Sequence, residues 1–241
     1  MKAAEANRRS TAGEVRRRIL GSRDRVWRIE DFEGSGDAVQ AELRRLVKAG
    51  ELDHVRRGVY WRGRKTRFGM TPASQGSALR KVLERNTAIG AAGWHAANLL
   101  GLSAQVSPIE VLAITARPPS GFSHLKLIDR SGRVGRRNQH LNDLEVTILE
   151  ALEGWETYVE EGAEQTVARF RDLLDRDDVR VAKLTAAANS EPAVVRERLR
   201  QVLLFAGMNS DANRIKRARS GKARQRALSV FPDSKAIVEA N

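Results

Sequence analysis

The sequence contains no cysteine, few aromatic residues and no long apolar run. The absence of cysteine excludes disulfide bonds and thiolate metal sites. No stretch approaches the roughly 20 apolar residues that a membrane span needs, and the first residues lack the apolar core of a signal peptide. Aromatic residues make up 5% of the 241 residues, which leaves few rings to stack on unpaired bases. These absences predict a cytoplasmic protein without a membrane partner.

Positive charge is concentrated at the two ends of the chain. Lys and Arg number 43 against 30 Asp and Glu, which gives a net charge of +13. Residues 1–65 carry 17 basic and 10 acidic side chains, residues 66–204 carry 18 and 17, and residues 205–241 carry 8 and 3. This excess favours a polyanionic partner, and nucleic acid ranks ahead of a membrane surface.

The N-terminal region has the element order of a winged helix-turn-helix. Apolar side chains recur at helical spacing on one face of residues 37–49, and polar side chains occupy the opposite face. A short alternating segment precedes this helix, and a hairpin with arginines at its turn follows it. The expected elements are a helix, a strand, a second helix and a two-stranded hairpin, over residues 11–20, 26–29, 37–49 and 52–61.

The helix over residues 37–49 has the chemistry of a recognition helix. A helix fits the major groove of DNA, where each base pair presents a distinct pattern of donors and acceptors. Its outward face offers cations and an amide, and the hairpin arginines would grip the flanking phosphates. The predicted DNA-binding residues are Ser35, Asp37, Gln40, Arg44, Arg45, Lys48, Arg56, Arg57 and Tyr60. The alternative, a solvated charged face, is less favoured because of the hairpin and the local charge.

The rest of the chain predicts strands followed by helices. Residues 62–76 are interpreted as a linker, and a small sheet is expected near residues 87–130, before a mainly helical C-terminal part. The sequence therefore predicts an α+β fold in three parts: a winged helix-turn-helix at 1–65, an α+β partner-binding domain at 66–208 and a basic tail at 209–241. The tail is interpreted as a frayed helix or a disordered arm.

Two segments carry a resemblance to a known family. Residues 43–60 have the sequence LRRLVKAGELDHVRRGVY, and residues 93–106 have the sequence GWHAANLLGLSAQV. Both are similar to segments of the AbiEi-type antitoxins of bacterial abortive-infection, type IV toxin–antitoxin systems, and the resemblance spans roughly residues 14–130. It implies an N-terminal domain that represses its own operon at an inverted-repeat operator in double-stranded DNA. It also implies a C-terminal domain that counteracts a cognate nucleotidyltransferase toxin.

An acidic segment lies within this basic protein. Between residues 143 and 178 there are 12 acidic and 3 basic side chains. In one interpretation these acidic side chains balance the charge of the basic tail or linker. In another they form a docking surface for a basic partner protein, and their charge steers its encounter with this protein. The predicted partner-binding residues are Glu153, Glu156, Glu160, Glu161 and Glu164.

Catalytic patterns are weak, and we predict no enzymatic activity, no metal and no cofactor. Gly21-Ser22 with Asp31 and Glu33 loosely matches the motif of nucleotidyltransferases, but the spacing is short and the preceding segment is helical in pattern. The four histidines lack the spacing of metal ligands, and no phosphate-binding glycine loop is present. The remaining alternatives are an RNA-binding or generic nucleic-acid-binding regulator without antitoxin activity, and a toxin-binding protein with a vestigial DNA-binding domain.

Overall fold

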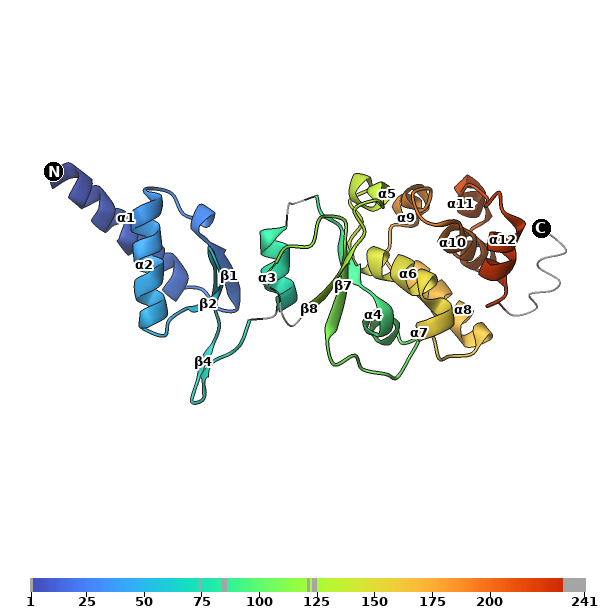
Figure 1. The fold of residues 1–241 in the computed structure, drawn as a ribbon, viewed down its shortest axis with the longest axis horizontal. Helices are drawn as coiled ribbons and strands as arrows, with labels where there is room; N and C mark the ends of the chain where they lie inside the picture. The colour runs from blue at the N-terminus through green and yellow to red at the C-terminus, as the bar shows by residue number, and fades with distance from the viewer. Residues whose placement is uncertain (1, 74, 84–85, 121, 123–124, 232–241) are drawn as a thin grey trace. The chain divides into compact units, whose positions relative to one another are not determined.

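The chain folds as a mixed α+β protein with two compact units, Met1–Glu84 and Arg85–Asn241 (Figure 1). The computed structural model describes residues 2–73, 75–83, 86–120, 122 and 125–231, with side chains from residue 11 onward except at residue 75. The first unit extends past the predicted domain boundary at residue 65. The segment beyond that residue belongs to it because Arg28 donates to the carbonyl of Lys81 and Trp61 donates to the carbonyl of Thr71.

The first unit combines three α-helices with short strands. Its main sheet has the order β1-β3-β2, and both pairings are antiparallel. A second, two-stranded sheet pairs β4 with β5. In chain order the elements are α1 (Lys2–Leu20), β1 (Arg25–Arg28), the 3-10 turn η1 (Ile29–Asp31), α2 (Gly36–Lys48), β2 (Asp53–Arg56), β3 (Val59–Arg62), β4 (Lys65–Thr66), β5 (Gly69–Met70) and α3 (Gln75–Val82).

The core of the first unit forms where α1 and α2 pack on the sheet. Its central aromatic residue is Trp27 of β1, which stacks on Phe32 with ring centroids 5.1 Å apart. The indole N–H of Trp27 donates to the hydroxyl of Ser22, so the buried ring keeps its polar atom satisfied. The buried members of this core are Val15, Ile19, Trp27, Phe32, Val39, Leu43, Leu46, Leu52 and Tyr60.

The start of α1 differs from the prediction. The first helix was expected over residues 11–20, yet α1 already begins at Lys2. Thr11 therefore lies inside the helix, where it is buried beside Gly34. Gly34 has a φ of +106°, and a Cβ at this position would lie 2.7 Å from the Thr11 hydroxyl. Only glycine fits this turn, which leads the chain into α2.

The second unit combines nine helices of varied length with a three-stranded sheet in the part of the chain that is described. The sheet order is β6-β7-β8, with β6 antiparallel and β8 parallel to the central β7. In chain order the elements are β6 (Ile89–Ala91), α4 (Gly93–Leu99), β7 (Glu110–Ile114), β8 (Leu125–Asp129), α5 (Val134–Asn138), α6 (Asp143–Glu153), α7 (Trp155–Tyr158), α8 (Ala163–Leu174), α9 (Val181–Ala188), α10 (Ala193–Phe205), α11 (Asn209–Arg214) and α12 (Gly221–Leu228).

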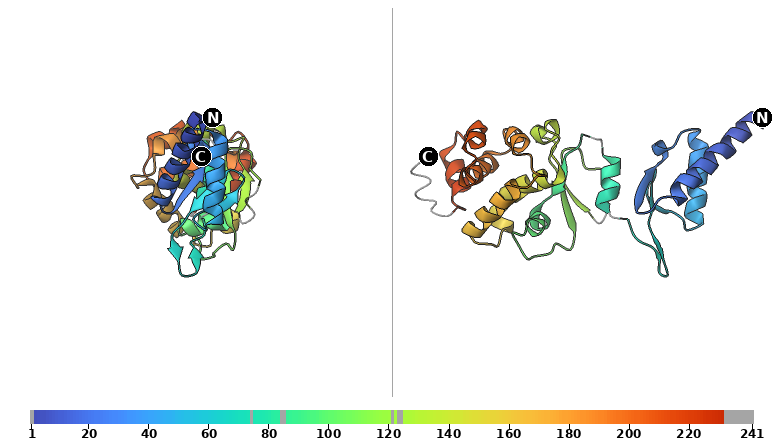
Figure 2. Two further views of the ribbon diagram at one scale, coloured as in Figure 1. Left: turned by 90° about the vertical axis from the view of Figure 1, so that its left-hand side faces the viewer. Right: turned by 180° about the vertical axis from the view of Figure 1, so that it is seen from behind.

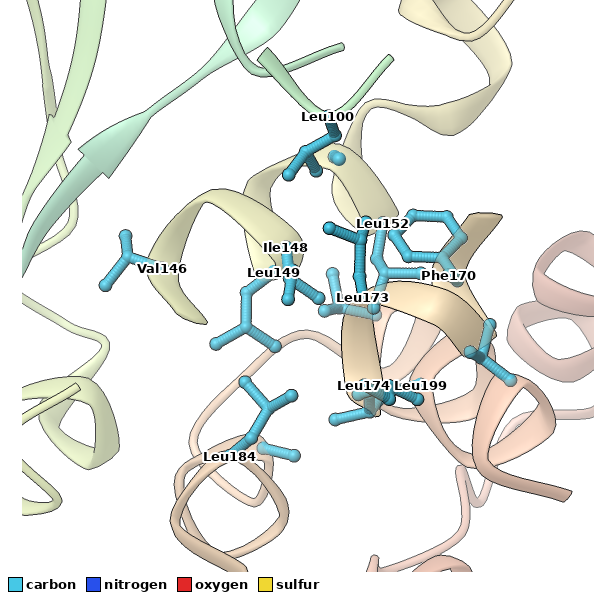
Figure 3. Packing of buried hydrophobic residues seen from close by; sticks show 14 of the residues in the cluster. Leu100, Val146, Ile148, Leu149, Leu152, Phe170, Leu173, Leu174, Leu184 and Leu199 are labelled. Carbon is cyan, nitrogen blue, oxygen red and sulfur yellow. The ribbon is translucent and has the colours of Figure 1, made fainter. Parts of the chain in front are cut away.

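Helix α6 runs through the centre of the second unit. Its side chains from Glu145 to Leu152 are all buried. Figure 3 shows Leu149 and Leu152 of this helix beside Phe170 and Leu173 of α8, in one continuous apolar cluster. The capping box at Asn142 explains where α6 begins, because its side chain accepts from the Glu145 amide and the Glu145 carboxylate accepts from the Asn142 amide.

A buried ion network lies beside α6. Arg136 of α5 is fully buried and donates to Glu191 at 2.7 and 2.8 Å and to Glu150 at 2.6 Å. Arg130 donates to Glu150 at 2.9 and 2.8 Å, and Arg133 lies 3.3 Å from Glu153. Burial lowers the pKa of Arg136, but its two carboxylate partners outweigh burial and raise the pKa above its ordinary value. The guanidinium therefore stays charged in the interior.

The segment from residue 209 corrects the prediction of a frayed or disordered tail. It forms α11 and α12, and six of its side chains are buried against the rest of the second unit: Ala212, Ile215, Ala218, Ala227, Leu228 and Phe231. The ring of Phe231 lies 5.0 Å from that of Trp155 in an edge-on arrangement. The apolar residues between the basic ones supply the burial that orders the segment. Residues 232–241 of the predicted tail lie outside the described residues.

Within the described ranges, no helix combines the length and the apolar character that crossing a bilayer requires.

Candidate nucleic-acid interface

A groove of about 550 Å³ lies in the first unit between α2 and the β2–β3 hairpin. Its walls are basic and polar, with a tyrosine ring edge and a short aliphatic side chain between them. The lining residues are Gln40, Arg44, Val47, Lys48, His54, Arg57, Gly58 and Tyr60. Five of these belong to the predicted DNA-binding set, so residues from two separate elements meet at one hollow.

Helical periodicity places the α2 side chains in this groove. Gln40, Arg44, Val47 and Lys48 follow the spacing of one helix face. The adjacent face of α2 is buried in the core of the unit. Arg44 and Lys48 are exposed, and no described carboxylate pairs with either of them. The groove therefore carries two cations whose charge is available to a ligand.

Arg45 is placed differently from the other predicted cations. It is exposed but does not line the groove, and its guanidinium lies 3.3 Å from the carboxylate of Glu42. The Glu42 side chain is 5% exposed and also faces Arg16 at 3.5 Å. Part of the charge of Arg45 is thus compensated within the molecule.

The β2–β3 hairpin supplies the opposite wall. Its turn is Arg57-Gly58, and Gly58 has a φ of +75°, a conformation that favours glycine. Arg57 is exposed at this turn, whereas Arg56 is half-buried. The rings of His54 and Tyr60 lie 5.3 Å apart across the two strands.

Three other predicted residues are placed differently from the groove cations. Tyr60 is 4% exposed and belongs to the core of the unit, with its accessible edge at the groove. Ser35 occupies the N-cap position of α2, but its side chain makes no capping hydrogen bond. Asp37 lies exposed in the first turn of the helix, where a negative charge is favourable. Ser35 is exposed too.

The residues of the loose nucleotidyltransferase pattern have local partners. Ser22 donates to the carbonyl of Ile19, and Asp31 accepts from the backbone of Arg28 and lies 2.8 Å from Lys81. These contacts hold the segment between α1 and α2 and, through Lys81, join it to α3.

Sequence reasoning missed a second basic feature of the first unit, the β4–β5 hairpin. Residues 62–76 were expected to be a linker because they contain Gly, Pro and cations without an apolar repeat. The strands pair at Lys65↔Met70 and Thr66↔Gly69, which leaves Arg67 and Phe68 as the two residues of the turn. Figures 1 and 2 show this hairpin projecting from α2 and the main sheet of the unit. The signal in the sequence is a short turn with glycine after it.

Two of the predicted partner-binding glutamates form ion pairs within the second unit. Glu153 lies 3.1 Å from Arg130 and 3.3 Å from Arg133. Glu156 pairs with the exposed Arg226 at 2.8 Å, and also with a buried arginine, Arg198, at 3.2 Å. The hydrogen bond from Arg226 is the main cause that lowers the pKa of Glu156. The pairing with Arg226 matches the interpretation that acidic residues balance the basic C-terminal segment.

The other glutamates are more open to solvent. Glu160 accepts from Ser103 at 2.5 Å and from Gln105 at 2.7 Å, and the Ser103 hydrogen bond is the main cause that lowers the pKa of its carboxyl. Glu161 and Glu164 are exposed, and no described cation pairs with their side chains. Of the five predicted residues, these two remain available to a partner.

A second hollow, of about 450 Å³, lies in the second unit among α4, α7, β7 and β8. Its lining includes Trp94 and Tyr158, with ring centroids 5.2 Å apart in an edge-on arrangement, and the ion pair of Glu153 with Arg130. His95 on α4 bonds through Nδ1 to the carbonyl of Val111 at 3.2 Å. Because a carbonyl only accepts, Nδ1 carries the proton, and this histidine is held as a structural donor.

Comparisons with known proteins do not assign the chain to a family. No family model matches the chain, and no curated protein matches it. Among solved structures, the RV2827C protein from Mycobacterium tuberculosis aligns with 93% of this chain and 80% of its own, at 16% sequence identity and a TM-score of 0.43.

Proposed function

We propose that this protein binds double-stranded DNA through a winged helix-turn-helix in its first unit. The observation that carries the proposal is the groove between α2 and the β2–β3 hairpin, which gathers Arg44, Lys48 and Arg57 from two elements. These side chains are exposed and face no described carboxylate. Free cations of this kind are what phosphate contacts require.

The order of elements supports the same proposal. A helix, a strand, a short helical turn, a second helix and a two-stranded hairpin follow one another, with β3 between β1 and β2. In winged helix-turn-helix domains the second of the two main helices enters the major groove and the hairpin contacts the flanking backbone. Here α2 would be the inserted helix, and Arg57 at the hairpin turn would touch phosphates. Gln40, at the start of the groove, has an amide that suits adenine.

The test is a binding titration with a matched control on the same helix. The purified chain is titrated against a labelled duplex from upstream of its own gene and a scrambled duplex of equal length, at several salt concentrations. The Arg44→Ala/Lys48→Ala variant removes the groove cations. Arg45→Ala removes a cation from the same helix outside the groove, while Glu42 keeps Arg16 as its partner.

We expect the upstream duplex to bind more tightly than the scrambled one. The double variant should bind at least tenfold more weakly, with the slope of log affinity against log salt lower by about 1.8 if both cations contact phosphates. Arg45→Ala should change the affinity much less than the double variant does. Equal affinity for both duplexes would reduce the interface to generic polyanion binding. An Arg44→Ala/Lys48→Ala variant that binds like the unaltered chain would remove the groove as the site.

The regulatory part of the proposal comes from the resemblance to AbiEi-type antitoxins. In that role the protein represses its own operon and its second unit counteracts a nucleotidyltransferase toxin. The exposed pair Glu161 and Glu164 is the part of the acidic segment that a basic partner could reach. Reversal of both charges should weaken protection against the toxin in co-expressing cells, and unchanged protection would exclude this surface.

A further inference from the structure

We infer that the β4–β5 hairpin is a second DNA-contacting arm, whose tip residues Arg67 and Phe68 enter the minor groove beside the duplex segment contacted by α2. This inference rests on the proposed function, since it adds a contact to the same interface. Phe68 is 85% exposed, more than any other large hydrophobic side chain in the described part of the chain. The ring at the hairpin turn is therefore accessible to a ligand and brings a large apolar surface to it.

The chemistry of the tip suits nucleic acid. The guanidinium of Arg67 lies over the ring of Phe68, 4.6 Å from its centroid, and no described carboxylate pairs with it. Residues 62–71 contain four basic residues and no acidic one. Proteins that bind the minor groove combine arginine with an apolar side chain that wedges between base steps. Arg67 and Phe68 place both groups side by side on one turn.

The hairpin is held in a fixed conformation. The hydroxyl of Thr66 donates to the carbonyl of Gly69 at 2.8 Å and accepts from the amide of Phe68 at 3.2 Å, so the turn is braced from within. At the base, Thr71 exchanges bonds with Arg64: its amide donates to the Arg64 carbonyl, and its hydroxyl accepts from the Arg64 amide, both at 2.9 Å. A preorganised arm loses little conformational entropy when it binds.

Ion pairs attach the base of the hairpin to the end of α2. Lys65 lies 2.5 Å and Arg62 lies 3.0 Å from Glu51, which follows the last turn of that helix. The hydrogen bond from Lys65 is the main cause that lowers the pKa of Glu51. Arg64 also pairs with Asp24 at 3.2 Å. The base of the arm is therefore attached at Glu51, three residues after Lys48, the last residue of α2.

Strand topology puts the two hairpin turns at opposite ends of β3. The chain enters β3 from the Arg57-Gly58 turn and leaves it at Arg62 toward β4. Four residues of strand separate the two ends by roughly 13 Å. With α2 in the major groove, Arg57 would touch the backbone on one flank, and Arg67 with Phe68 would reach the minor groove on the other.

The experiment compares three variants on the upstream duplex. Phe68→Ala removes the ring, Phe68→Leu keeps an apolar wedge, and Arg67→Ala removes the charge. Val106→Ala is the control, because Val106 is 79% exposed but lies in the second unit. Affinity is measured by fluorescence anisotropy over a salt series, and contacts are mapped by hydroxyl-radical footprinting. Thermal unfolding verifies that each variant folds.

Phe68→Ala should weaken binding about 5- to 150-fold, the range for loss of one base–aromatic contact, with an unchanged salt slope. Phe68→Leu should recover part of the affinity. Arg67→Ala should lower the salt slope by about 0.9, as loss of one phosphate contact does. Both alanine variants should lose protection on one flank of the footprint, and Val106→Ala should match the unaltered chain.

The outcomes separate this inference from the proposed function. If Arg44→Ala/Lys48→Ala abolishes binding while Phe68→Ala and Arg67→Ala leave affinity and footprint intact, the groove stands and the arm is overturned. If the unaltered chain binds no duplex, both proposals fail. If Phe68→Ala weakens binding to a single strand of the same sequence as much as binding to the duplex, Phe68 does not act as a minor-groove wedge. Binding of anionic vesicles that Phe68→Ala abolishes, with duplex binding unchanged, would assign the arm to a membrane surface instead.

Discussion

Replacement of Arg136 by methionine probes the buried ion network of the second unit. The variant loses three short hydrogen bonds, to Glu191 at 2.7 and 2.8 Å and to Glu150 at 2.6 Å, and leaves both carboxylates in the interior. Glu150 keeps Arg130 at 2.9 and 2.8 Å, whereas the remaining ion pair of Glu191 is with Arg133 at 3.5 Å. Removal of one partner from a buried pair costs about 3–5 kcal/mol. We expect the lower part of this range, because Glu150 stays paired.

Hydrogen exchange measured by mass spectrometry reports the loss of stability in each of the two units separately. Peptides from α10 report on the second unit, and peptides from α2 serve as the internal control in the first. A loss of about 3 kcal/mol in the free energy of unfolding corresponds to exchange roughly 100-fold faster in the most protected amides of α10. The amides of α2 should be unchanged.

The cost should depend on pH in a defined direction. Burial raises the pKa of Glu150, but the hydrogen bonds and charges of Arg130 and Arg136 outweigh burial and hold it below the ordinary value of 4.5. A carboxyl with a lowered pKa stabilises the fold above its unfolded pKa, and this contribution is lost as the pH falls through the folded value. Arg136→Met removes part of it. The difference in the free energy of unfolding between the unaltered chain and the Arg136→Met variant is therefore largest near neutral pH and shrinks below about pH 4.5.

A double substitution provides the control. Arg136→Met/Glu191→Leu removes the less well paired carboxylate together with the guanidinium, so it should recover much of the lost stability. A cost below about 1 kcal/mol for Arg136→Met alone would refute this account of the network. A double variant no more stable than the single one would refute it as well.

Three further substitutions and conditions give distinct expectations. Glu156→Gln should destabilise the second unit more than Arg226→Ala in urea unfolding, because it deprives the buried Arg198 of its carboxylate, whereas Arg226 is exposed. Gly90→Ala should lower the free energy of unfolding by about 1–3 kcal/mol in the same assay. The added Cβ would lie 2.7 Å from a side-chain carbon and 2.8 Å from backbone atoms of α6. A change within experimental error would mean that the sheet and α6 separate easily. Below about pH 4.5 the β4–β5 hairpin should loosen as Glu51, whose pKa is lowered, becomes protonated, and the NMR amide signals of the hairpin would reveal it.

The elements predicted well are those with a strong local pattern. Helix α2 spans Gly36–Lys48 where residues 37–49 were expected, because its apolar spacing is unambiguous. The strand β7 spans Glu110–Ile114, inside the region near residues 87–130 where a small sheet was expected. The groove residues Arg44, Lys48 and Arg57 were found for the same reason, since charge on an amphipathic helix and on a hairpin turn is visible in the sequence.

The elements that were missed depend on distant partners. Helix α5 has no apolar repeat, and its buried residue is Arg136, which is satisfied by carboxylates 14 and 55 positions away. The strand β6 is three residues long and contains Gly90, whose place depends on close contact with α6. The C-terminal segment was misjudged because its cations dominate the composition, while its scattered apolar side chains gain burial only from the assembled unit. The exposure of Phe68 likewise is invisible without the fold.

The core of the second unit includes Phe231, near the end of the described chain, so the two units can complete their cores at different times during synthesis. The buried cluster of the first unit is complete once Tyr60 has been made, whereas that of the second unit includes residues from Ala88 to Phe231. At about 5–20 residues per second, the ribosome takes roughly 9–34 s to pass from one point to the other. The first unit can therefore fold while the second is still being translated. The nascent chain would display the groove and the arm before its C-terminal half has a core of its own.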